Sequence, residues 1–158
     1  MTEDYLQIMI ESLEKKTDVL DRALELDKRQ LAIAMAQPFD NDAYNRSMEE
    51  KGELIDELNR LDDGFTGTYE LVRDSVRANP KAYAAQIEKM QTLIRMTIDK
   101  GVAIEAQEKR GKQAMESVVG SRRRELKEKK RSSVVARQYY KAMSKINTVD
   151  PQLMDKRK

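Results

Sequence analysis

The sequence contains no cysteine, no histidine and no tryptophan. Without cysteine, disulfides and thiolate metal sites are excluded. Without histidine, the chain lacks the commonest general acid–base and the Glu-x-x-His ligand pairs of di-iron helical bundles. Its serine and lysine residues show no nucleophile-and-base arrangement, and we interpret its acidic clusters as solvated helix faces. We therefore expect no catalytic activity, no cofactor and no metal.

Helix-breaking residues are also scarce, with 6 Gly and 3 Pro in 158 residues. Charged residues make up 37% and hydrophobic residues 39% of the chain, a mixture that favours long helices over a sheet. No stretch approaches the roughly 20 apolar residues of a membrane span, and the acidic N-terminus does not resemble a signal peptide. We expect an all-α protein in the cytoplasm, without insertion into a membrane.

Apolar side chains recur at alternating spacings of four and three in the first segment, as they do along one stripe of a helix. This stripe comprises Leu6, Ile10, Leu13, Thr17, Leu20, Leu24, Asp27, Leu31 and Ala34. The pattern predicts a helix over about residues 3–36. Pro38 ends it, and Asp40 or Asn41 can cap the next helix.

The same spacing predicts a second helix over about 41–78 and a third over about 80–131. The second stripe contains Tyr44, Met48, Lys51, Ile55, Leu58, Asp62, Phe65, Tyr69, Val72 and Val76. The third contains Tyr83, Ile87, Met90, Ile94, Thr97, Gly101, Ile104, Glu108, Gly111, Met115 and Val118. Short connectors at Pro38 and Pro80 predict that residues 1–131 form one antiparallel bundle of three long helices.

Residues 132–158 differ from the bundle and form a C-terminal arm. Val135, Tyr139, Met143 and Ile146 are spaced four, four and three, which predicts one apolar face of a short amphipathic helix. Such a helix is marginal alone in water. It either packs on the bundle as a fourth helix or stays a flexible tail that docks on a partner.

Several segments, in their order along the chain, resemble the FlgN-type flagellar export chaperones of clostridial bacteria. The first is Asp4-Tyr5-Leu6-Gln7-Ile8-Met9-Ile10 with Ser12-Leu13-Glu14-Lys15-Lys16. The second is Glu50-Lys51 with Leu54-Ile55-Asp56-Glu57-Leu58 and Leu61-Asp62-Asp63-Gly64-Phe65. The third is Tyr139-Tyr140-Lys141-Ala142-Met143 with Val149-Asp150-Pro151-Gln152-Leu153-Met154-Asp155-Lys156.

The resemblance implies a helical cytoplasmic chaperone of the flagellar type III secretion system. Proteins of this family bind the C-terminal helical regions of hook–filament junction proteins, keep them unassembled and deliver them to the export apparatus. The similar FliT class, which serves the filament cap protein, is an alternative. Our candidate contact residues for a client are the apolar positions of the third helix and of the arm: Met90, Ile94, Ile104, Met115, Val135, Tyr139, Met143 and Ile146.

Two further classes compete with a chaperone. Residues 121–158 hold 13 Lys and Arg against 4 Asp and Glu, whereas residues 1–120 hold 17 against 24. A basic run can contact nucleic acid, but no reading motif accompanies it, and we expect no nucleic-acid partner. The heptads also permit a homodimer or a structural coiled-coil adaptor, although Pro38 and Pro80 favour a hairpin within one chain.

Overall fold

The computed structural model describes residues 1–129 and 140–143, and within them every regular element is helical. The elements are α1 (Thr2–Met35), α2 (Asn41–Ala78), a short 3₁₀ turn η1 (Pro80–Tyr83) and α3 (Ala84–Lys129). The prediction of an all-α chain with three long helices is confirmed. Residues 140–143 are helical, and the rest of the arm, with its boundary at residue 132, lies outside the described residues.

The ends of the helices follow the capping signals of the sequence. Asp40 caps α2, since its side-chain carboxylate accepts a hydrogen bond of 3.0 Å from the backbone N–H of Ala43. Pro80 opens η1, where its missing N–H costs nothing. η1 then runs directly into α3, so the third helix begins as a 3₁₀ turn rather than as a regular α-helix.

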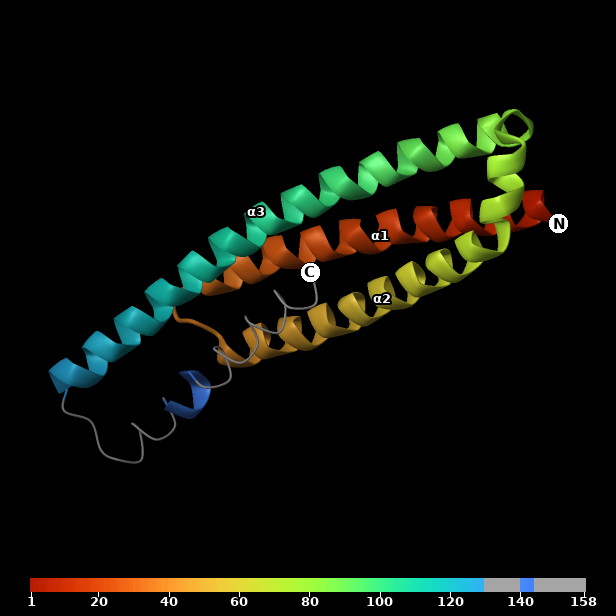
Figure 1. The fold of residues 1–158 in the computed structure, drawn as a ribbon. Coiled ribbons are helices and arrows are strands. Elements are labelled where there is room, and N and C mark those ends of the chain that lie inside the picture. The colour runs from red at the N-terminus through yellow and green to blue at the C-terminus, as the bar shows by residue number, and fades with distance from the viewer. Residues whose placement is uncertain (130–139, 144–158) are drawn as a thin grey trace.

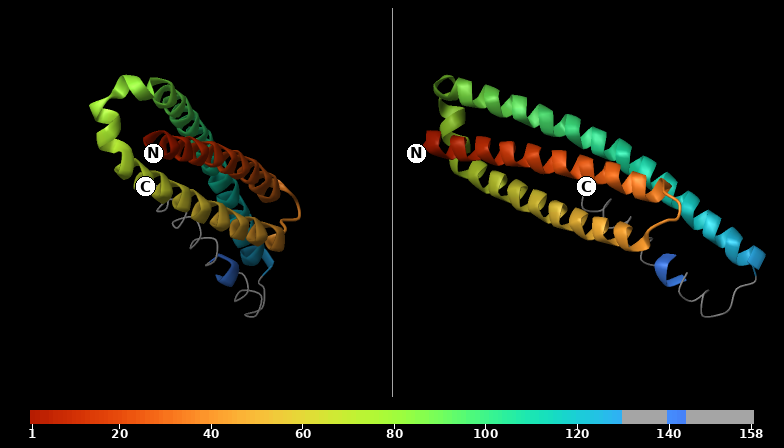
Figure 2. Two further views of the ribbon diagram at one scale, coloured as in Figure 1. Left: turned by 90° about the vertical axis from the view of Figure 1, so that its right-hand side faces the viewer. Right: turned by 180° about the vertical axis from the view of Figure 1, so that it is seen from behind.

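Helix α1 lies between α2 and α3 and runs antiparallel to α2 (Figures 1 and 2). Arg22 and Arg29 of α1 pair with acidic residues of α2 at N–O distances of 3.2 and 3.1 Å. On another side of α1, Asp21 pairs with Lys100 of α3. Because α2 and α3 each pack mainly on α1 and contact each other little, α1 is the central element of the bundle.

This central position gives α1 a wider buried face than the single stripe that we expected. Most of the predicted stripe is buried, but a second line at the same spacing is buried beside it. The second line comprises Met9, Val19, Ala23, Leu26 and Gln30. A helix with one neighbour needs one apolar stripe, whereas a helix with two neighbours needs two.

The buried side chains form three successive clusters along the bundle. Each draws on all three helices, as in the first, where Leu6 of α1 packs with Val72 of α2 and Met90 of α3. The second contains Leu26, Leu54 and Ile104, and the third contains Ala34, Tyr44 and Met115. Each helix is thereby held along most of its length.

A polar layer interrupts this apolar core where three polar members of the predicted stripes meet. Lys51 of α2 places its Nζ 2.7 Å from Oδ1 of Asp27 on α1 and 3.9 Å from Oε1 of Glu108 on α3. Lys51 and Asp27 are both buried. Beside them, the buried Gln30 amide donates a hydrogen bond of 3.0 Å to the hydroxyl of Ser47. The layer therefore ties all three helices together at one level.

Helix α2 is continuous over its 38 residues, but its last turns bend toward the start of α3 (Figure 1). In the C-terminal half of α2, the Thr68 hydroxyl donates a hydrogen bond of 2.9 Å to the backbone carbonyl of Gly64, a contact that often bends helices. A Cβ added at Gly64 or Gly67 would meet no atom within 4 Å. These glycines therefore do not mark a close helix crossing.

Candidate partner-binding surface

Three of the four contact residues that we expected on α3 lie in the core. The exposed fractions of Met90, Ile104 and Met115 are 8%, 4% and 3%. Their side chains pack against α1, so a partner would reach them only if α3 moved away from it. Ile94 is the exception, with 38% of its surface exposed. We call the buried line of α3 from Met90 to Met115, which packs against α1, the seam of α3. The structure therefore moves the candidate surface away from this seam.

The candidate residues of the arm are mostly beyond the described part of the chain. Val135, Tyr139 and Ile146 lie outside it, and Met143 is half-buried within the short helical segment 140–143. Beside Met143, Tyr140 is 67% exposed. The arm therefore stays a sequence-based candidate, and the surface on α3 is built from the described residues alone.

A line of exposed aliphatic side chains runs along α3, one position removed from its buried seam. Ile94, Ile98 and Val102 follow one another at a spacing of four residues, which places them on one ridge of the helix. Ile98 and Val102 are 60% and 63% exposed. We call these three residues the α3 strip.

The strip is held in place because the neighbouring face of α3 is fixed to α1. Met90 and Ile104 pack into the core on that face. Lys89 and Lys100 pair there with acidic residues of α1, the former at 3.8 Å from Glu14. Since both sides of this α1–α3 contact are long continuous helices, the strip is presented as a preformed ridge.

Charged side chains of both signs surround the strip. Arg95 and Asp99 lie between its members along the chain, and Glu105 and Lys109 follow it; all four are exposed. A surface with an apolar centre and a charged rim is typical of protein–protein contacts.

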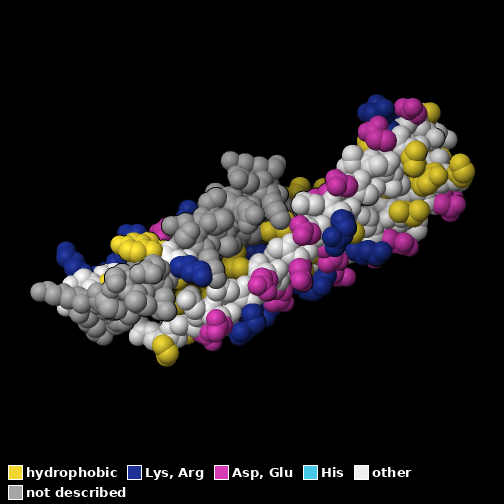
Figure 3. All heavy atoms as spheres, turned by 90° about the horizontal axis from the view of Figure 1, so that it is seen from below, with side chains coloured by type: hydrophobic (Ala, Val, Ile, Leu, Met, Phe, Trp, Pro, Cys, Tyr) yellow, Lys and Arg dark blue, Asp and Glu magenta, His cyan; other side chains and the backbone are white. Residues whose placement is uncertain are grey.

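Other exposed apolar side chains are isolated by comparison. Leu71 of α2 is 65% exposed and Met96 of α3 is 42% exposed, but neither has an exposed apolar neighbour four residues away along its helix. On the face seen from below, charged side chains of both signs are interspersed along the middle of the molecule, and hydrophobic side chains gather at the end that holds the start of α1 (Figure 3). Among the described residues, the α3 strip is therefore the surface that best fits a helical partner.

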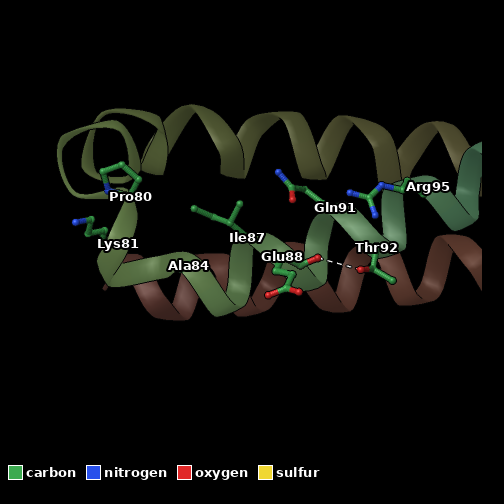
Figure 4. Close-up of a pocket in the computed structure, with 8 residues that line it drawn as sticks. All are labelled: Pro80, Lys81, Ala84, Ile87, Glu88, Gln91, Thr92 and Arg95. Carbon is green, nitrogen blue, oxygen red and sulfur yellow. Dashed lines mark hydrogen bonds between the residues drawn. The ribbon is translucent and has the colours of Figure 1, made fainter.

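An open depression of about 560 Å³ extends the strip toward η1 (Figure 4). Ile87, Gln91 and Arg95 line it, each seven residues before a member of the strip. The Thr92 hydroxyl in its wall is already engaged, since it donates a hydrogen bond of 3.1 Å to the Glu88 carbonyl. Only η1 and the first turns of α3 contribute to the wall. The depression therefore belongs to the same elongated surface and is not an enclosed ligand site.

Sequence reasoning identified Ile94 but missed Ile98 and Val102. Those two residues follow Thr97 and Gly101 of the predicted stripe by one position, and we treated only the stripe as apolar surface. The signal that could have revealed them is the second spacing of four, which continues from Ile94 outside the heptad. A line of aliphatic side chains beside a face that is already buried indicates that the helix has a second contact surface.

Two further tests of the described residues bear on the function. None of their helices has a stretch that is both long and apolar enough to cross a bilayer. Within the same residues, no group of three or more Asp and Glu side chains could hold a metal ion. Comparison of the chain with family models, with curated proteins and with solved structures finds no match.

Proposed function

We propose that this protein is a cytoplasmic export chaperone of the FlgN type, which binds C-terminal helical segments of hook–filament junction proteins. It keeps these clients unassembled and delivers them to the flagellar export apparatus, and it catalyses no reaction. The observation that carries the proposal is the α3 strip, a preformed aliphatic ridge on a helix that is anchored along α1. An amphipathic helix of a client supplies the matching face.

The physical basis of binding is burial of the strip against a client helix. Ridges formed by residues four apart pack into the grooves between equivalent ridges of a second helix. Covering Ile98 and Val102, both more than half exposed, contributes a large part of the roughly 1.5–3 kcal/mol that burial of each such side chain yields. Because the ridge is preformed, little of this energy is lost in ordering the chaperone.

The resemblance supplies the class of client, and the strip supplies the mode of binding. The segments that resemble the FlgN type contain Leu6, Ile10, Leu13 and Leu54, which are core residues of α1 and α2. The first two segments therefore carry the fold of the chaperone, whereas the third lies in the arm and contains the candidate contact residues Tyr139 and Met143. The exposed residues of the α3 strip lie outside all of these segments.

Co-purification tests the proposed client class directly. The full chain is expressed together with the C-terminal segment of each hook–filament junction protein, of the filament cap protein and of flagellin. We expect a stable complex with a junction-protein segment and none with flagellin. A complex with the cap segment alone would assign the chain to the FliT class, and a chain that retained none of the segments would refute an export chaperone of either class.

A further inference from the structure

We propose that the α3 strip is also a self-association surface, on which a second copy of this chain docks in an antiparallel pair centred on Ile98. The pair covers the strip when no client is present. This pairing does not depend on the flagellar assignment, because it rests only on the strip and the charged residues that flank it.

The spacing of the strip makes it self-complementary. Ile94 and Val102 lie four residues before and four residues after Ile98. A two-fold axis at Ile98 therefore places Ile94 of one copy against Val102 of the other, and Ile98 against itself. Every aliphatic member of the strip then meets an aliphatic partner.

The flanking polar residues select the antiparallel direction. Gln91 lies seven residues before Ile98 and Glu105 lies seven after it, so the pair brings an amide donor to a carboxylate. Glu88 lies ten residues before Ile98, so its direct counterpart is Glu108, whose side chain is part-buried against Lys51. The adjacent Lys109 is exposed and brings the opposite charge close to Glu88 at each outer end. A parallel pair in register would instead place Glu105 against Glu105 and Lys109 against Lys109, which is unfavourable.

The surrounding structure leaves room for this pair and limits its strength. Met90 and Ile104 hold the neighbouring face of α3 against α1, and Ile98 and Val102 remain more than half exposed beside that contact. Three aliphatic side chains with a charged rim make a contact smaller than the roughly 800 Å² per partner of stable interfaces. We therefore expect a weak, concentration-dependent dimer. A client that binds the same ridge displaces the second copy, so self-association and client binding exclude each other.

Sedimentation of the full chain between about 10 μM and about 1 mM, the range in which weak complexes dissociate, tests the pair. We expect wild type to shift from monomer to dimer with concentration. Ile98→Asp should weaken the dimer at least about 10-fold, since the two-fold axis places two carboxylates face to face. Leu71→Asp, an equally exposed apolar position on α2, should leave it unchanged. A monomer at every concentration, or equal effects of the two variants, would overturn the proposal.

Charge reversal tests the antiparallel register without touching the strip. Glu88→Lys and Lys109→Glu should each weaken the dimer by placing like charges together, and the double variant should recover most of the wild-type association.

Cysteine cross-linking tests the position of the two-fold axis. Because the chain has no cysteine, Ile98→Cys should form a disulfide between two copies under mild oxidation, while Leu71→Cys should not. Failure of the double variant to recover, or equal cross-linking at both positions, would refute this arrangement. Client binding by a chain that stays monomeric would refute the pair and leave the proposed function intact.

Discussion

Replacing Lys51 with methionine is expected to lower the free energy of unfolding by about 3–5 kcal/mol. Its Nζ is 2.7 Å from Asp27 and 3.9 Å from Glu108, and the Lys51 and Asp27 side chains are buried. Removing the ammonium takes the Lys51 charge away from the buried Asp27 carboxylate and from the part-buried Glu108 carboxylate beside it. Urea unfolding followed by circular dichroism measures the loss, provided that the transition is two-state.

Two matched variants separate this effect from a general cost of substitution. Lys28→Met removes a lysine from an exposed i,i+3 pair with Glu25, and surface pairs of that kind contribute less than about 1 kcal/mol. Asp27→Leu together with Lys51→Met replaces the buried pair by apolar side chains and should restore most of the lost stability. Equal losses for Lys51→Met and Lys28→Met would contradict a buried polar layer.

Leu26→Ala is expected to destabilise the bundle by about 2–5 kcal/mol, the range for truncation of a fully buried leucine. Leu26 has no exposed surface and belongs to the second cluster, together with Leu54 of α2 and Ile104 of α3. It lies on the second buried line of α1, which exists only because α1 has two neighbouring helices. Its truncation therefore tests the central position of α1.

Leu31→Ala provides the comparison, because Leu31 lies on the stripe that the sequence predicted but is only half-buried. Both variants remove the same atoms from the same helix, so differences in helix propensity cancel. We expect the Leu31 variant to lose clearly less stability than the Leu26 variant in the same urea titration. A larger loss at Leu31 would mean that α1 packs through one seam only.

The three long helices were predictable because their signals are local. Pro38 and Pro80 break the chain, and Asp40 caps α2 with a hydrogen bond that involves residues three apart. The heptad spacing then marks one buried face in each segment. Which helix becomes central is not a local property, and this explains why the second buried line of α1 was not predicted.

The polar layer could not be predicted from local signals either. Asp27, Lys51 and Glu108 were recognised as polar members of three separate stripes. Their meeting depends on how far each helix is shifted along its neighbours, and that shift is fixed by the whole of the three apolar clusters. Once the helices are aligned, the charges reinforce the alignment, because any other register would bury a carboxylate without the ammonium.

The candidate surface was predictable only in part, for a related reason. Seam residues such as Ile104 and Met115 are the most conspicuous apolar positions of α3, and α1 covers them. The residues left for a partner are those that the bundle does not use, Ile98 and Val102. They can be identified only after the internal contacts are known.

Calorimetric titration of strip variants of the full chain with the co-purifying client segment measures whether the α3 strip is the client-binding surface. Ile98→Asp with Val102→Asp should weaken binding by about 100-fold, about 2.7 kcal/mol, because two aliphatic contacts are replaced by carboxylates that binding must desolvate. The control, Leu71→Asp with Met96→Asp, introduces the same charge at exposed apolar positions outside the strip and should bind as wild type does. Unchanged affinity in the strip variant, with the control also unchanged, would show that partners bind elsewhere on this molecule.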